Sequence, residues 1–327
     1  MRTSSIIALG LLVLAVIDNL FAAAFYPSAA IINKSKKPFI SRIFYNIGQS
    51  SPYTTLSKEP QGDTKSSSSS QTSPDPFEIW GKMRLGLGTG PGSNPDGVFW
   101  VGGGALYEVY SGKILAIFEG FDIGKGVRIS DTHIRQLSRK IFWFRDPESG
   151  DIMTEFDGKP VNPIVYDSQM IDYHKGSDGS ITYSVEASLR VLKDALPKMK
   201  ITSHMAGPQQ MMINIPVFLD IPIPNGQNPG NGGGAGGGRY QAWEFYDYNV
   251  DPKFPADRPP TAVWCRQGSV PPFNMDSKAV LRFSGYRVES YNDLPERMKV
   301  EVERAYPHFQ EPPKDSDEAL LHADRRR

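Results

Sequence analysis

The stretch SDGSITYSVEA, residues 177–187, indicates which class of fold this chain adopts. From Ile181 to Ala187, apolar side chains occupy every second position and alternate with Thr, Ser and Glu. Neighbouring side chains on a β-strand point to opposite faces, so this alternation predicts a strand with one buried and one solvated face. The Ser-Asp-Gly triplet before the strand is typical of a tight turn between two antiparallel strands.

Segments of the same kind recur along the chain, rich in β-branched and aromatic residues. Short turns such as Ser111-Gly112 and Asp157-Gly158 separate them. Neighbours joined by short turns must be antiparallel, because a parallel crossover needs a dozen or more residues. The further strands expected in this way are 97–101, 105–110, 114–118, 140–145, 211–218, 240–248, 261–267 and 279–288.

These strands predict a mainly β fold, with a single antiparallel sheet that forms a β-barrel or a lipocalin-like curved sheet. Closing a long sheet removes its exposed edges, which would otherwise need protection. One C-terminal helix is expected over residues 294–306, where apolar residues repeat at helical spacing. Asn292 or Asp293 can cap this helix, and Pro295 suits its first turn.

Composition divides the chain around this β-rich domain, which is expected over residues 77–313. Residues 59–76 contain many Ser and Pro and few apolar side chains, so they predict a disordered linker. The Gly-rich tract 225–238 lies between two strongly patterned segments and predicts a loop inserted within the domain. Residues 314–327 predict a charged tail.

The N-terminal segments predict export from the cytosol. Residues 1–24 have Arg2 before an apolar run and end in small residues, as secretory signal peptides do. The run is shorter than the ~20 residues that span a bilayer, so no stable transmembrane segment is expected after processing. Residues 25–58 are basic, hydroxyl-rich and free of acidic residues, which is typical of a transit peptide. The two segments, with Phe25 between them, resemble the bipartite presequence of algae with secondary plastids. The expected location is the plastid (chloroplast), and the alternative is secretion.

Several further motifs belong to expected turns and packing segments. They are RDPESGDIM at 145–153, GKPV at 158–161, WCRQ at 264–267, LPER at 294–297 and YPHF at 306–309. Together they resemble the family catalogued as domain of unknown function 1838, over most of residues 80–313. The resemblance implies no activity, cofactor or catalytic residue, and the tract 225–238 departs from the family's pattern.

Composition and spacing exclude several functions. Lys and Arg together number 36, as do Asp and Glu, so no net field draws the chain to nucleic acid. The only cysteine, Cys265, cannot form an intramolecular disulfide. The glycines at 86–92 and 120–126 lack the spacing of a dinucleotide fingerprint or a P-loop. The five histidines show no metal-ligand spacing, so no metal site is predicted, and the cofactor is unknown.

The density of aromatic residues in the expected strands predicts an apolar cavity inside the curved sheet. The alternative is an ordinary packed core. The candidate ligand-binding residues are Trp100, Tyr107, Trp143, His174, His204, Trp243, Glu244 and Arg266. The predicted function is to bind or act on a small apolar ligand, such as a pigment, isoprenoid or lipid. The alternative is a non-enzymatic structural or assembly protein of the plastid, and the residues do not decide whether the protein is an enzyme.

Overall fold

The computed structural model describes residues 75–187, 199–222, 239–268 and 278–324. The signal peptide, the transit peptide, the linker up to residue 74 and the Gly-rich tract lie outside these ranges, and they stay predictions. Within the described ranges, no helix combines the length and the apolar character needed to cross a membrane.

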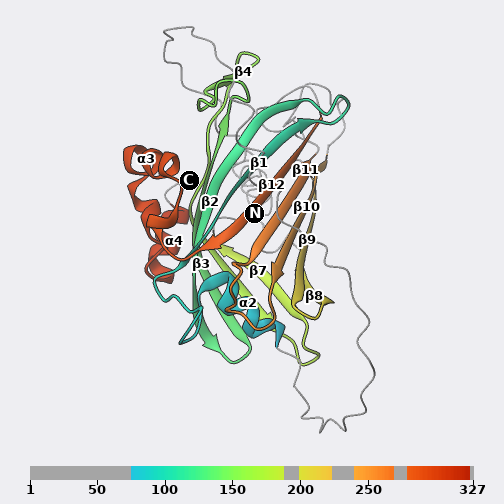
Figure 1. Cartoon of the computed structure of the whole chain (residues 1–327), viewed down its shortest axis with the longest axis vertical. Coiled ribbons are helices and arrows are strands. Elements are labelled where there is room, and N and C mark those ends of the chain that lie inside the picture. The colour runs from blue at the N-terminus through green and yellow to red at the C-terminus, as the bar shows by residue number, and fades with distance from the viewer. Residues whose placement is uncertain (1–74, 188–198, 223–238, 269–277, 325–327) are drawn as a thin grey trace, which may run out of the picture.

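Ten antiparallel strands close into a barrel, in the order β1-β12-β11-β10-β9-β8-β7-β6-β3-β2, with β2 pairing with β1 (Figure 1). This confirms the mainly β, single antiparallel barrel expected from the sequence. The strands are β1 Val98–Glu108, β2 Ile114–Ser130, β3 His133–Arg145, β6 Ile164–Lys175, β7 Ile181–Ala187, β8 Met199–Gly207, β9 Gln210–Pro222, β10 Arg239–Val250, β11 Thr261–Gly268 and β12 Ala279–Val288. A separate two-stranded sheet contains β4 Glu155–Phe156 and β5 Lys159–Pro160.

Strand β1 runs without a break through the glycines at 102–104, where the sequence predicted two separate strands. These glycines let neighbouring strands approach closely. A Cβ atom added at Gly104 would lie 1.7 Å from the carbonyl oxygen of Arg282 on β12. A Cβ atom added at Gly120 on β2 would lie 2.1 Å from the carbonyl oxygen of Ile141 on β3. Such glycines are typical of sharply bent positions in a barrel wall.

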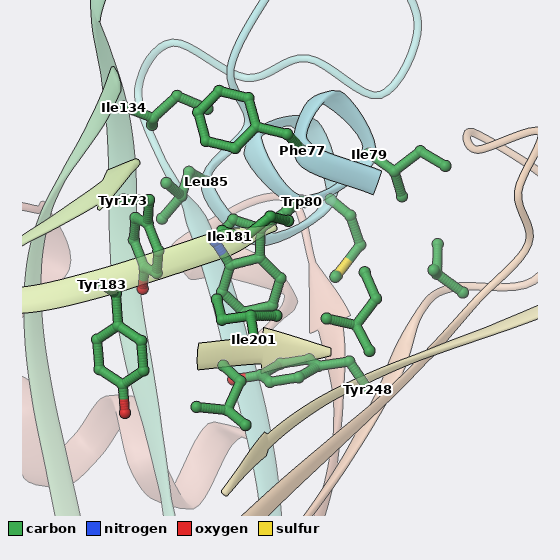
Figure 2. Packing of buried hydrophobic residues seen from close by; sticks show 14 of the residues in the cluster. Phe77, Ile79, Trp80, Leu85, Ile134, Tyr173, Ile181, Tyr183, Ile201 and Tyr248 are labelled. Carbon is green, nitrogen blue, oxygen red and sulfur yellow. The ribbon is translucent and has the colours of Figure 1, made fainter. Parts of the chain in front are cut away.

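Helix α2 (Pro76–Leu85) closes one end of the barrel (Figure 1). Asp75 caps its first turn by accepting a hydrogen bond from the backbone N–H of Phe77. Gly86 ends the helix in the left-handed conformation, with φ of 66°. Trp80 is fully buried and projects from α2 among side chains of the surrounding strands (Figure 2). The helix therefore fills this end of the barrel with its own side chains.

The opposite end of the barrel has no such helix among the described residues. Neighbouring strands alternate in direction, so the strand ends that border residues 188–198, 223–238 and 269–277 all lie at this end. We call this end the open end and the other the α2 end.

The C-terminal segment packs on the outside of the barrel (Figure 1). It contains η2 Tyr291–Asp293, α3 Glu296–Ala305, η3 Pro307–Gln310 and α4 Ser316–Asp324. Helix α3 is the C-terminal helix expected from the sequence, and its Met298 and Val302 are buried against the outer face of β1 to β3. Helix α4 lies within residues 314–327, for which the sequence predicted only a charged tail. Its Ala319 is fully buried.

Arg139 on β3 joins this C-terminal segment to the barrel. Its guanidinium donates to the carbonyl oxygens of His308 at 2.6 Å and Glu311 at 2.7 Å. It also pairs with the carboxylate of Glu318 on α4 at 2.5 Å. The Arg139 side chain is only 4% exposed, so these bonds replace the water that the charge loses on folding.

Candidate functional site

The strand register places alternate residues of each strand inside the barrel. On β3, Phe142 and Phe144 face the interior, whereas Trp143 packs against the C-terminal segment outside. The interior therefore has an aromatic lining between the α2 end and the open end. Its members are Phe118, Phe142, Phe144, Tyr246, Trp264 and Phe283.

The aromatic side chains meet across the interior of the barrel. Phe118 on β2 and Trp264 on β11 are separated by β1 and β12, yet their ring centroids are 5.8 Å apart. Phe118 also stacks on Phe142 at 4.8 Å, and Trp264 stacks on Tyr246 at 5.7 Å. These contacts join side chains of β2, β3, β10 and β11 into one apolar surface.

Glu244 lies within this surface, and the four residues Glu244, Tyr246, Trp264 and Arg266 are called the Glu244 centre here. The Tyr246 hydroxyl and the Trp264 indole N–H donate to one carboxylate oxygen, at 2.7 and 3.2 Å. Arg266 Nη1 lies 3.1 Å from the other oxygen. Burial, reinforced by the charge of Glu244, raises the pKa of Tyr246 well above its usual value, so the phenol remains a hydrogen-bond donor.

The Glu244 centre is not completely packed. Tyr246 and Trp264 face inward in a closed barrel, yet both are only half-buried, and the Arg266 side chain is 17% exposed. Phe118, on the facing wall, is fully buried. Tyr246 and Trp264 are therefore the members of the aromatic lining that keep some exposure, whereas the other four are buried.

A second polar group, called the Asp122 centre here, lies between the aromatic lining and α2. Asp122 on β2 accepts from Arg84 of α2 at 2.7 Å, and the Lys140 ammonium of β3 lies 3.7 Å from the same oxygen. Burial by itself lowers the pKa of Arg84, but the Asp122 carboxylate raises it overall, so the guanidinium stays charged. The other oxygen of Asp122 is buried and accepts no hydrogen bond from the described residues.

Three of the residues predicted from the sequence to bind a ligand face the interior. Glu244 and Arg266 form the ion pair of the Glu244 centre. Trp100 lies at the α2 end, where its indole N–H donates to the backbone carbonyl of Arg84 at 3.3 Å. Trp100 therefore helps to hold α2 in the barrel.

The other five predicted residues do not reach the interior. Trp143 is buried under the C-terminal segment, and Trp243, on the outer face of β10, is 48% exposed. His204 is exposed on the outer face of β8, opposite Met212. Tyr107 follows the inward-facing Leu106 and points to the opposite face. His174 lies on the outer face of β6, beside His133.

Arg84, Asp122 and Lys140 also face the interior, and none of them was predicted to do so. A signal for two of them exists in the spacing. Asp122 follows Phe118 by four residues and Lys140 precedes Phe142 by two, and such even spacing puts residues of one strand on the same face. No comparable signal marks Arg84, because α2 was not expected.

Cys265 lies between the inward-facing Trp264 and Arg266, so it faces outward. Burial raises the pKa of its thiol, an effect that the nearby Arg282 only partly opposes. A raised pKa disfavours the nucleophilic thiolate.

Residues 98–321 match the family described as "Protein of unknown function (DUF1838)". The chain belongs to this family. The DUF1838 match extends from β1 into α4, so it contains every strand of the barrel, whereas α2 precedes it. No curated protein matches the chain. The description of DUF1838 assigns no activity.

Proposed function

We propose that the barrel binds a small apolar molecule that carries an acidic head group, such as a lipid-like carboxylic acid. The observation that supports this most directly is the half-buried, inward-facing Tyr246 and Trp264 of the Glu244 centre. An apolar surface that water reaches inside a closed barrel gains free energy when an apolar ligand replaces that water, at about 25 cal/mol per Å².

The architecture also supports an internal ligand. An eight-stranded barrel is just wide enough to be filled by its side chains or to hold one small ligand, and the diameter grows with strand number. This barrel has ten strands, and α2 fills only one end of it. The aromatic lining between α2 and the open end is the part that remains for a ligand.

The charges of the two polar centres favour an acidic head group. Arg84, Lys140 and Arg266 face two carboxylates, those of Asp122 and Glu244. Arg84 and Lys140 share Asp122, so the two centres together carry three positive charges and two negative charges. Lys140 is the natural partner of a ligand carboxylate, because its contact with Asp122 at 3.7 Å is the longer of the two. Charge-assisted hydrogen bonds of this kind contribute about 1.5 to 3 kcal/mol.

The test is calorimetric titration of the purified full-length chain with dodecanoic acid and, separately, with 1-dodecanol. We expect both to bind, and the acid to bind about tenfold more tightly because of the charge-assisted bond to Lys140. Lys140→Met should abolish the preference for the acid, whereas Lys200→Met, on the outer face of β8, should leave it unchanged.

A second pair of variants tests whether the ligand lies inside the barrel. Trp264→Ala removes an inward-facing ring and should weaken binding of both compounds, whereas Phe245→Ala, its outward-facing counterpart on β10, should have no effect. Absence of binding by either compound would contradict the proposal. So would an effect of Phe245→Ala equal to that of Trp264→Ala.

One observation favours the second function, an assembly protein. Phe218, Trp243 and Phe245 form an aromatic patch on the outer face of β9 and β10, with exposed fractions of 54%, 48% and 43%. Phe218 and Phe245 contact each other edge to face, with centroids 5.7 Å apart. Exposed apolar patches often mark interaction surfaces. Loss of self-association in Phe245→Ala, in a chain that binds neither dodecyl compound, would favour this function instead.

A further inference from the structure

We propose that His133, Asp172 and His174 form a binding site for a divalent transition-metal ion, such as Zn²⁺ or Co²⁺. The site lies on the outer face of β3 and β6, so it is separate from the barrel interior and independent of the function proposed above. One potential ligand atom from each residue lies within 4.8 Å of the other two.

The register of the two strands brings the histidines together. His133 on β3 is directly opposite His174 on β6, and their ring centroids are 4.2 Å apart. Cross-strand partners have Cβ atoms about 4.5 to 5.5 Å apart, which is close enough for two imidazoles to bind one ion. Both residues lie on paired strands of the barrel, so the backbone holds them in place.

The third group already lies at a suitable distance. His133 Nε2 is 3.3 Å from Asp172 Oδ1. A tetrahedral zinc ion binds nitrogen and oxygen at about 2.0 to 2.2 Å, which places its ligand atoms roughly 3.4 Å apart. His133 Nε2 is buried, and its polar contact is this long one with Asp172. An ion bound to both atoms would replace that contact with two metal–ligand bonds.

Arg135 positions the carboxylate of this site. It binds Asp172 with two hydrogen bonds, from Nε to Oδ1 at 2.7 Å and from Nη2 to Oδ2 at 2.8 Å. These two bonds fix the orientation of the carboxylate on the outer face of β6. Each carboxylate oxygen has a further lone pair, so Oδ1 can still bind an ion.

The site differs from a structural zinc site in two respects. It has three protein ligands, and structural zinc sites usually have four, so at least one position of the ion stays open to water or another ligand. The positive charge of Arg135 also repels a cation, so we expect weaker binding than at a structural zinc site. His174 is exposed, which gives an ion access from solvent.

The test uses the full-length chain without a polyhistidine tag. Co²⁺ is added while its visible absorption is recorded, and the Zn²⁺ affinity is measured by competition with a chromophoric chelator. We expect one ion per chain. His174→Ala and His133→Ala should each lower the affinity at least about tenfold. Loss of a residue that only hydrogen-bonds to a metal ligand already lowers metal affinity by about that factor, and these two residues are ligands themselves.

His204→Ala is the matched control, because His204 is also an exposed histidine on the outer face of the barrel. It should bind both ions as the unmodified chain does. Circular dichroism establishes that each variant is folded, and we expect His174→Ala to fold because His174 is exposed. Unchanged affinity in folded His174→Ala would overturn the proposal, as would an equal loss in His204→Ala.

Discussion

Among the glycines that the structure describes, Gly104 leaves the least room for a Cβ atom. The closest atom to an added Cβ is a backbone carbonyl oxygen at 1.7 Å, so a larger residue forces β1 and β12 apart. Overpacking usually costs about 1 to 3 kcal/mol, and backbone atoms relax less readily than side chains. We therefore expect Gly104→Ala to lower the free energy of unfolding by more than about 3 kcal/mol, measured by urea denaturation.

Gly103 provides the control for this prediction. It is the next residue along β1, but an added Cβ there would lie 3.4 Å from its nearest neighbour, an ordinary contact. Gly103→Ala should therefore change the stability by less than about 1 kcal/mol. Equal effects of the two substitutions would mean that β1 and β12 do not approach each other closely at Gly104.

The sequence predicted that a curved sheet has an aromatic interior, but only three of the eight residues proposed to line it face inward. Glu244 and Asp247 are an odd number of residues apart on one strand, and the structure places Glu244 inside and Asp247 outside. The pairing of His133 with His174 was not predictable, because it depends on which residues of β3 and β6 are opposite each other. The register shift between these strands makes that choice harder to infer.

Among the elements, the C-terminal segment depends most on one side chain. Arg139→Ala removes its hydrogen bonds to two carbonyl groups of this segment and its ion pair with Glu318. Removing one partner of a buried pair costs roughly 3 to 5 kcal/mol. We expect urea denaturation to show a loss of about 3 kcal/mol or more, and limited proteolysis to cut residues 306–324 faster.

Arg304 serves as the comparison for Arg139. It lies on α3 and pairs with Glu301 of the same helix, with its side chain 68% exposed. Exposed pairs contribute about 0 to 1 kcal/mol, so Arg304→Ala should leave both stability and proteolysis nearly unchanged. If Arg139→Ala behaves in the same way, the segment is held by apolar packing alone.

The helices that the sequence did not predict lack a regular apolar stripe. Most of α2 is buried, including Gly81 and Arg84, so its apolar residues do not mark one face. In α4, Ala319 is fully buried whereas Leu321 is 53% exposed, so its apolar residues do not share one face. Helix α3 was predicted because Met298 and Val302 form a stripe that packs on one surface. Tertiary contacts, and not local periodicity, determine the other two helices.

For the whole molecule, closure predicts the pattern of amide hydrogen exchange. β1 and β12 pair through ten residues, so neither is an edge strand. In the described part of the chain, β7 and β8 pair through only three residues. We expect slow exchange in β1 and β12 and the fastest strand exchange where β7 meets β8, as measured by mass spectrometry. Rapid exchange along both β1 and β12 would indicate an open sheet.

The sequence left two arrangements of the sheet open, a barrel and a curved half-barrel. Hairpin turns fix which strands are neighbours and that they are antiparallel, but they do not reveal whether the first strand meets the last. That contact involves residues far apart in the chain and gives no local signal. The register of β1 against β12 resolves the question in favour of the barrel.

This meeting of the first and last strands has a consequence for folding. The ring can close only after β12 has been synthesised, whereas α2, which precedes β1, is synthesised before every strand of the barrel. Contacts between such distant parts of a chain form slowly, because the loop between them loses entropy first. Until that step the aromatic lining is exposed to solvent. A ligand too wide to pass through the open end of the closed barrel can enter only before β1 pairs with β12.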